Sequence, residues 1–184
     1  LKRLTDKRLN QARGVRGAFG GMPDSWVHDP KTLPIFGPRI AWRMVARSTD
    51  TRTFIASVLP PEVLVTHHSY CIFFREFEPG DDAYLLGVFS STAFDWLARR
   101  VVEINLTGEL VSALPVPVAD RSNPLRRRVA ALAGHLVAPV DSLNEWRKAC
   151  VALDSDVIEL GRAEAENELD ACVFLLYGLD AEEA

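Results

Sequence analysis

Residues 39–61 constrain the fold of this chain more than any other stretch, because they hold two period-2 patterns separated by a polar turn. In the first pattern the apolar residues share one side of a strand: Ile40, Trp42, Met44 and Ala46. The other side carries three arginines: Arg39, Arg43 and Arg47. The turn at residues 48–51 leads into a second run, residues 52–59, which Pro60-Pro61 ends. The stretch therefore predicts a β-hairpin with one apolar and one basic face, and with Arg52 as a further arginine near its tip.

Two alternatives accompany this prediction. Arginines spaced i, i+4, i+8 would also align on a helix, but the β-branched and aromatic content and the Pro-Pro ending favour strands. On strands, the arginines either form a solvated charged edge or a surface that binds a polyanion, and the spacing alone leaves both open.

Charge is segregated along the sequence, although the formal net charge is only −4. Residues 1–60 hold 11 Lys and Arg against 4 Asp and Glu, residues 61–110 hold 3 against 8, and residues 111–184 hold 7 against 13. A polyanion would therefore meet the first third of the chain rather than its acidic C-terminal part.

Residues 1–35 read as a basic, Gly-rich linker or N-terminal extension. Its basic residues could alternatively follow a phosphate backbone: Lys2, Arg3, Lys7, Arg8, Arg13 and Arg16. After the hairpin, two more strands are expected at residues 63–66 and 69–77, and residues 111–118 read as a short edge strand because they contain two prolines.

A helix is predicted for residues 83–102, with an apolar stripe that packs behind the sheet: Leu85, Leu86, Phe89, Ala93, Trp96 and Leu97. Beyond residue 118 the period changes from 2 to 3.6, and helices are expected to begin near Ser122, Ser142 and Glu164. The last should end at Gly178 in a left-handed C-cap followed by the apolar Leu179.

The predicted fold class is therefore α+β: a small, mostly antiparallel β-sheet with a backing helix, followed by a C-terminal helical part. The expected divisions are the extension at residues 1–35, a β-rich domain at residues 36–118 and a helical bundle or spacer at residues 119–184.

No pattern in the sequence is typical of a catalytic centre. There is no Gly-rich loop for a dinucleotide or S-adenosylmethionine, no Ser-His-Asp set and no metal-nuclease cluster. Cys71, Cys150 and Cys172 lack C-x-x-C pairing, so three reduced thiols are expected. The pair His67-His68 has no further ligands at useful spacing. We therefore predict no catalytic residue, no metal site and no cofactor in this chain.

The sequence also gives expectations about the location of the protein and about whether the chain is complete. No stretch approaches the roughly 20 apolar residues that a membrane-spanning helix needs, and the start does not resemble a signal peptide. A cytoplasmic protein without membrane contact is expected. Leu1 is not an initiator methionine, and the final D-x-x-E has the form of a helix-opening capping box. We therefore expect a piece of a longer product.

Three sequence patterns together resemble one family. They are R-I-A-W-R followed by S-T-x-x-R-T-F-I-A-S-V-L-P, then Y-L-L-G-V-F-S-S-T-A-F-D-W-L-A-R-R with L-P-V-P, and finally E-L-D-A-C-V-F-L-L-Y-G-L-D. In this order they resemble the C-terminal target-recognition region of type IIG-like restriction-modification and phage-defence adenine-N6 DNA methyltransferases. The likeness covers about residues 36–180, and it departs from the family at Phe89-Ser90-Ser91, where Leu-Asn-Ser is expected.

The resemblance implies a DNA-binding module that gives sequence specificity to the methyltransferase. Its partners would be double-stranded DNA and an upstream catalytic domain of the same polypeptide, which would bind S-adenosylmethionine. The residues expected at the DNA surface are Arg39, Arg43, Arg47, Thr49, Arg52, Thr53, His67, Arg99 and Arg100. Arginine suits this role because its planar fork grips phosphate or pairs with guanine.

Two other functions remain open from the sequence. The chain could be a protein-interaction or docking module of a larger enzyme, with arginines that are merely solvated, or a hydrolase with an unrecognised site. Binding to duplex DNA that weakens steeply with salt would distinguish the first reading from the docking module.

Overall fold

The computed structural model describes residues 6–9, 22–29, 32–72 and 80–179, and the chain divides into two compact units, Leu1–Gly37 and Pro38–Ala184. In the first unit residues 6–9 are helical, helix α2 spans Asp24–His28 and the 3-10 turn η2 spans Pro34–Phe36.

Arg8 is the most deeply buried charged residue described in the first unit. Its guanidinium donates to Thr32 Oγ1 at 2.8 Å and to Asp29 O at 2.7 Å, and it lies 4.7 Å from the centre of the Trp26 ring. Only 2% of Arg8 is exposed, so this arginine holds the unit together and the suggestion that it follows a phosphate backbone is wrong. Most of the other basic residues that could follow a phosphate backbone lie outside the described residues.

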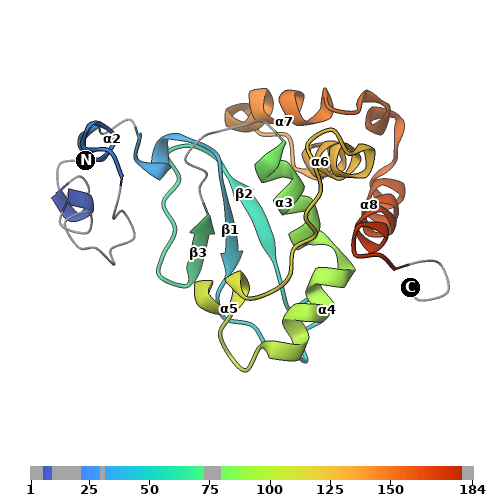
Figure 1. Cartoon of the computed structure of the whole chain (residues 1–184), viewed down its shortest axis with the longest axis horizontal. Helices are drawn as coiled ribbons and strands as arrows, with labels where there is room; N and C mark the ends of the chain where they lie inside the picture. Colours follow the sequence, from blue (N-terminus) through green and yellow to red (C-terminus); the bar gives the residue numbers. More distant parts are fainter. Residues whose placement is uncertain (1–5, 10–21, 30–31, 73–79, 180–184) are drawn as a thin grey trace. The chain divides into compact units, whose positions relative to one another are not determined.

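The second unit opens with a three-stranded antiparallel sheet of order β2-β1-β3 (Figure 1). The central strand β1, Arg39–Arg43, pairs on one side with β2, Ala56–Leu59, and on the other with β3, Ser69–Ile72. The predicted hairpin is confirmed, but its connection is residues 44–55 rather than a four-residue turn.

The strand expected at residues 63–66 does not form, and these residues have no regular secondary structure. Of the strand expected at residues 69–77, β3 covers the first four residues, and residues 73–79 lie outside the described part of the chain.

Trp42 anchors the sheet to the rest of the core. Its ring stacks on Phe54 and Tyr70, with centroid distances of 6.1 and 5.4 Å, and meets Phe89 edge-on. Its indole N–H donates to Leu106 O at 2.9 Å, which satisfies the polar end of a residue that is only 4% exposed.

The helix predicted for residues 83–102 is two helices, α3 at Asp81–Ser90 and α4 at Thr92–Val101. The break is at Ser91, whose backbone is extended and whose hydroxyl accepts from Phe94 N at 3.2 Å and donates to Val88 O at 2.7 Å. Serine caps a new helix here more favourably than it continues the old one. The change of axis leaves Trp96 55% exposed, so its predicted place in the buried stripe is wrong.

The strand predicted for residues 111–118 is also wrong. Helix α5, Gly108–Ser112, covers the first of these residues. It begins at Gly108 because Thr107 accepts from Leu110 N at 3.3 Å as its N-cap. The following proline-containing segment is a strap without regular structure, held by two tyrosines. Tyr84 donates to Pro117 O at 2.9 Å, and Tyr177 donates to Pro115 O at 2.8 Å.

The C-terminal part is helical, as predicted. It consists of α6 at Pro124–Leu136, η3 at Asp141–Leu143, α7 at Asn144–Val151, η4 at Ser155–Glu159 and α8 at Arg162–Leu176. Helix α6 is capped by Asn123 rather than by the expected Ser122. The predicted C-cap of α8 is confirmed: Gly178 has a φ of 79°, and Leu179 N donates to Phe174 O at 3.0 Å.

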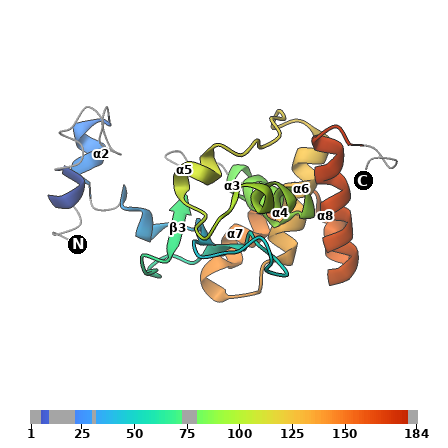
Figure 2. The same ribbon diagram turned by 90° about the horizontal axis from the view of Figure 1, so that it is seen from below.

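Helices α3 and α4 form the middle layer of the second unit. Figures 1 and 2 show them between the sheet and the helices α6 and α8. Helix α3 approaches α6 closely at Gly87, where a Cβ would lie 2.5 Å from Val129 Cγ1. One apolar core therefore joins the sheet to the C-terminal helices, from Ile40 to Val173. None of the described helices is long and apolar enough to cross a membrane.

Candidate nucleic-acid interface

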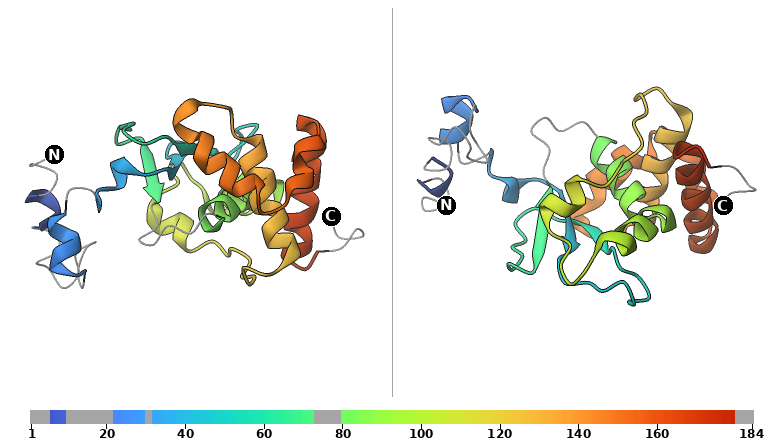
Figure 3. Two further views of the ribbon diagram at one scale, coloured as in Figure 1. Left: turned by 90° about the horizontal axis from the view of Figure 1, so that it is seen from above. Right: turned by 60° about the horizontal axis from the view of Figure 1, so that its bottom comes forward.

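The connection between β1 and β2 extends one end of the sheet beyond the strands. Met44 N donates to His68 O at 2.9 Å, Ala46 N donates to Ile104 O at 3.0 Å, and Leu106 N donates to Met44 O at 2.7 Å. These bonds place residues 44–47 between the turn at residues 66–69 and the segment that follows α4 (Figure 3). We refer to residues 47–54, the rest of this connection as far as Phe54, as the recognition loop.

Two arginines of the β1–β2 region and one of α4 end at the surface, and we call them the outward arginines: Arg43, Arg47 and Arg100. The side chain of Arg43 is 42% exposed and contacts Asp50 Oδ2 at 2.8 Å. Arg47 is exposed, and its guanidinium makes no hydrogen bond or ion pair with any residue in the described ranges. Arg100 lies over the exposed ring of Trp96, 4.8 Å from its centre.

The inner side of the recognition loop is held by Asp95 of α4. Asp95 Oδ1 accepts from Thr53 N at 2.8 Å and from Phe54 N at 2.7 Å. Asp95 is only 7% exposed, and its carboxylate replaces the strand partner that these two amides lack.

Arg99, one helical turn further along α4, holds the other half of the loop. It donates to Asp95 Oδ2 at 3.0 Å, to Ser48 O at 2.8 Å and to Thr51 O at 2.6 Å. Asp95 and Arg99 together form a clamp that binds donors and acceptors of the loop backbone, and we call this pair the loop clamp. The guanidinium of Arg99, a predicted DNA contact, is thus engaged by the chain itself, and its side chain is 30% exposed.

Arg52 also turns inward. Its guanidinium donates to Phe54 O at 3.2 Å and to the carbonyl oxygens of Ser90 and Ser91, where α3 ends. A cation is favourable at this helix end because of the carbonyl groups that the helix leaves unpaired.

Two predicted surface positions are wrong, because Arg39 and Thr53 are buried, with 5% and 0% exposed. Arg39 begins β1, at the end of the sheet opposite the recognition loop, and donates to the carbonyl oxygens of Pro60 and Val63. Thr53 Oγ1 donates to Arg47 O at 3.0 Å within the loop. Both side chains find backbone partners inside the protein, so alternation alone does not place them in solvent.

Thr49 and His67 are exposed, as expected of residues that contact a ligand. The rings of His67 and His68 lie against each other with centroids 3.9 Å apart. In the part of the chain that is described, no three His, Cys, Asp or Glu side chains gather as a metal site.

Two buried groups with raised pKa values, Asp82 and Cys150, lie away from the recognition loop. Asp82 accepts from Trp146 Nε1 at 2.6 Å, and burial raises the pKa of Asp82 more than this hydrogen bond lowers it. Burial raises the pKa of Cys150 to about 12, so this thiol stays protonated and is not a nucleophile near neutral pH. Both groups pack inside the core.

The sequence reasoning missed the loop clamp and the role of Asp50. Asp95 and Arg99 are spaced i, i+4 on a helix, a spacing that favours an ion pair and was the available signal. Asp50 Oδ2 also accepts from Arg47 N at 3.2 Å, as aspartates in tight turns do.

Comparison with protein-family models, with curated proteins and with solved structures gave no match.

Proposed function

We propose that this chain is a DNA target-recognition module, which gives sequence specificity to an adenine-N6 DNA methyltransferase of a restriction-modification or phage-defence system. Its DNA surface is the recognition loop with the outward arginines. The observation that carries the proposal is the loop clamp: a polar loop whose backbone is held from inside while the outward arginines face solvent.

Rigidity matters because a loop that is ordered before binding loses less conformational entropy when it meets its ligand. The clamp satisfies four backbone groups of the recognition loop from one side.

The nine residues expected from the resemblance divide into two groups on this proposal. Direct contact with DNA is assigned to five exposed residues: Arg43, Arg47, Thr49, His67 and Arg100. The other four position the loop or the sheet: Arg39, Arg52, Thr53 and Arg99. Arg47 is the strongest candidate for a base or phosphate contact because its guanidinium is not engaged by the described residues.

The chemistry of methyl transfer is assigned to an upstream domain of the same polypeptide, which would bind S-adenosylmethionine. This chain would then supply affinity and choice of sequence. Which bases are chosen depends on side-chain placement in the DNA groove.

The test is binding of a fluorescently labelled DNA duplex to this chain across a series of salt concentrations. Phosphate contacts release counterions, so affinity should fall steeply as salt rises. Arg47→Ala should weaken binding, whereas Arg127→Ala, which removes an exposed arginine of α6, should not. Affinity that is absent, or equal loss in both variants, would contradict the proposal.

A second candidate function, docking onto another polypeptide, is favoured by a separate observation, the open edge of β2. It concerns a different surface and is developed below.

A further inference from the structure

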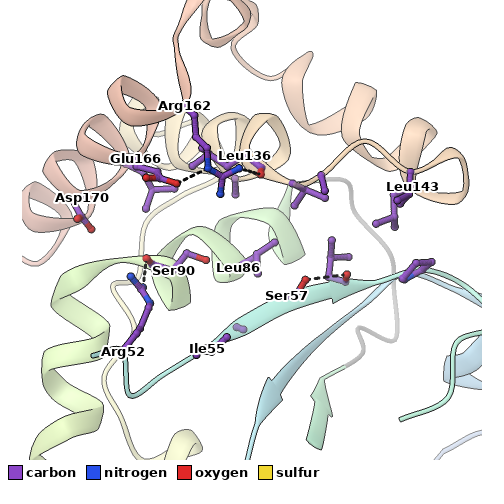
Figure 4. Close-up of a pocket in the computed structure, with 18 of the residues that line it drawn as sticks. Arg52, Ile55, Ser57, Leu86, Ser90, Leu136, Leu143, Arg162, Glu166 and Asp170 are labelled. Carbon is purple, nitrogen blue, oxygen red and sulfur yellow. Dashed lines mark hydrogen bonds and ion pairs between the residues drawn. The ribbon is translucent and has the colours of Figure 1, made fainter. Parts of the chain in front are cut away.

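A cleft of about 680 Å³ lies between β2 and the helices of the C-terminal part (Figure 4). Ser57 and Val58 of β2 both line it, although successive residues of a strand point to opposite faces of the sheet. The cleft therefore runs along the edge of β2 and not over one face.

On this edge, β2 pairs with no strand in the described part of the chain. Arg43 N donates to Ile55 O at 3.0 Å, which fixes the alternation of the β1–β2 ladder. It follows that Ser57 and Leu59 turn their backbone groups toward β1, while Ala56 and Val58 turn theirs away. Within the described ranges, the only hydrogen bond to these outward groups is from Ser57 Oγ, 3.4 Å from Val58 O.

The outward groups do not face open solvent. Ala56 is half-buried and Val58 is only 5% exposed. The opposite wall of the cleft is apolar and comes from four elements through Leu86, Leu136, Leu143 and Leu169. Partly buried N–H and C=O groups without a partner are unfavourable, so a ligand that supplies both donors and acceptors would gain from this position.

The rim of the cleft carries no excess charge. Arg52 and Arg162 are balanced by Glu166 and Asp170, and Arg162 pairs with Glu166 at 2.9 Å (Figure 4). The strand itself, Ala-Ser-Val-Leu, has none of the charged residues that commonly block an open sheet edge. A polyanion would find no excess positive charge here. An uncharged extended backbone would find hydrogen-bonding groups on the edge of β2.

We propose that this cleft binds an extended peptide segment of another polypeptide, which pairs with Ala56 and Val58 as a fourth strand of the sheet. Alternate side chains of that segment would be apolar and rest on the leucine wall. This is strand addition, in which main-chain hydrogen bonds give affinity and side-chain pockets give selectivity. The site lies beside the recognition loop, whose Arg52 is on its rim, but the inference does not rest on the DNA proposal.

The probe is a capped peptide of alternating threonine and valine, and the readout is amide hydrogen exchange of the whole chain followed by NMR. The peptide should slow exchange at Ala56 and Val58 by at least about tenfold. The Ser57 and Leu59 amides, already bonded to β1, should not change. The same peptide N-methylated on every backbone amide should have no effect, and added salt should not weaken the binding.

Two variants test the geometry. Ala56→Pro removes one outward N–H without removing a bond to β1, and should lower peptide affinity at least about fivefold. Ser57→Ala keeps the backbone and should bind as the unchanged protein does. If Ala56→Pro does not fold, Val140→Asp serves instead, because Val140 lines the cleft and is 41% exposed, so a charge there blocks apolar contact without entering the core.

The proposal is overturned if the peptide leaves exchange at Ala56 and Val58 unchanged, or if the N-methylated peptide protects them equally. It is also overturned if the chain alone forms a dimer in which these two amides are protected, since a second copy would then be the occupant of the edge.

Discussion

The arginines near the first hairpin fall into two groups that differ in what their guanidinium groups meet. Arg39, Arg52 and Arg99 end on backbone carbonyl oxygens of the chain, and we call them the inward arginines. The outward arginines end at the surface instead. Arginine therefore has two roles in this region, one in contacts within the chain and one at the surface. Arg43 also donates to Arg52 O at 3.3 Å, but its side chain remains 42% exposed, so the two groups are separated by exposure.

The largest effect on stability is expected from the carboxylate that holds the recognition loop. Asp95→Ala leaves two buried backbone N–H groups without an acceptor and removes the partner of Arg99. The free energy of unfolding should fall by about 3 kcal/mol. Urea unfolding followed by tryptophan fluorescence measures it. The control is Glu103→Ala, an exposed carboxylate just after α4, and a loss no larger than that of the control would contradict the role given to Asp95.

An inward arginine should matter more for folding than for binding. Arg39→Ala removes the donor to Pro60 O and Val63 O at a position that is 5% exposed. We expect a loss of about 2 kcal/mol in the free energy of unfolding. The folded variant should keep the salt dependence of DNA binding of the unchanged protein. A change in that salt dependence would place Arg39 in the DNA surface after all.

The two groups of arginines also show how far local sequence pattern predicts this fold. The hairpin and the cap at Gly178 were predicted because each depends on residues close in sequence. The burial of Arg39 and the clamp at Asp95 were not, because each depends on partners more than 20 residues away: Val63 O for Arg39 and Thr53 N for Asp95.

Two further errors have the same origin. Residues 111–118 have the alternation of an edge strand, but the hydroxyl of Tyr84 and that of Tyr177 hold the segment as a strap against distant helices. The helix expected across Ser91 breaks because the Ser91 hydroxyl caps α4 and Arg52 binds the carbonyl groups at the break. Pattern predicted the hairpin and the C-terminal helices, but not the elements whose bounds depend on polar contacts with distant residues.

A conservative change tests the role of Arg99 in the loop clamp. Arg99→Lys keeps the charge but offers no planar fork for both Ser48 O and Thr51 O. The free energy of unfolding should fall by about 1 kcal/mol. Amide exchange of the recognition loop should become faster while exchange in α6 stays unchanged. Loop exchange equal to that of the unchanged protein would show that Arg99 does not order the loop.

The smallest effect on stability is expected at an outward arginine. Arg100→Ala removes a contact with the exposed Trp96 ring, and the free energy of unfolding should fall by about 0.5 kcal/mol or less. Thermal unfolding of this variant compared with that of the unchanged protein measures the loss. A loss close to that of Arg39→Ala would erase the distinction between the two groups.

The most direct measurement is the salt dependence of duplex DNA binding for the unchanged chain and for a variant in which Arg43, Arg47 and Arg100 are all replaced by Ala. We expect the slope of log affinity against log salt to shrink by roughly one for each arginine that grips a phosphate, with little change in stability. Equal slopes for the two proteins, or no salt-dependent binding by the unchanged chain, would contradict the claim that the outward arginines form a DNA surface.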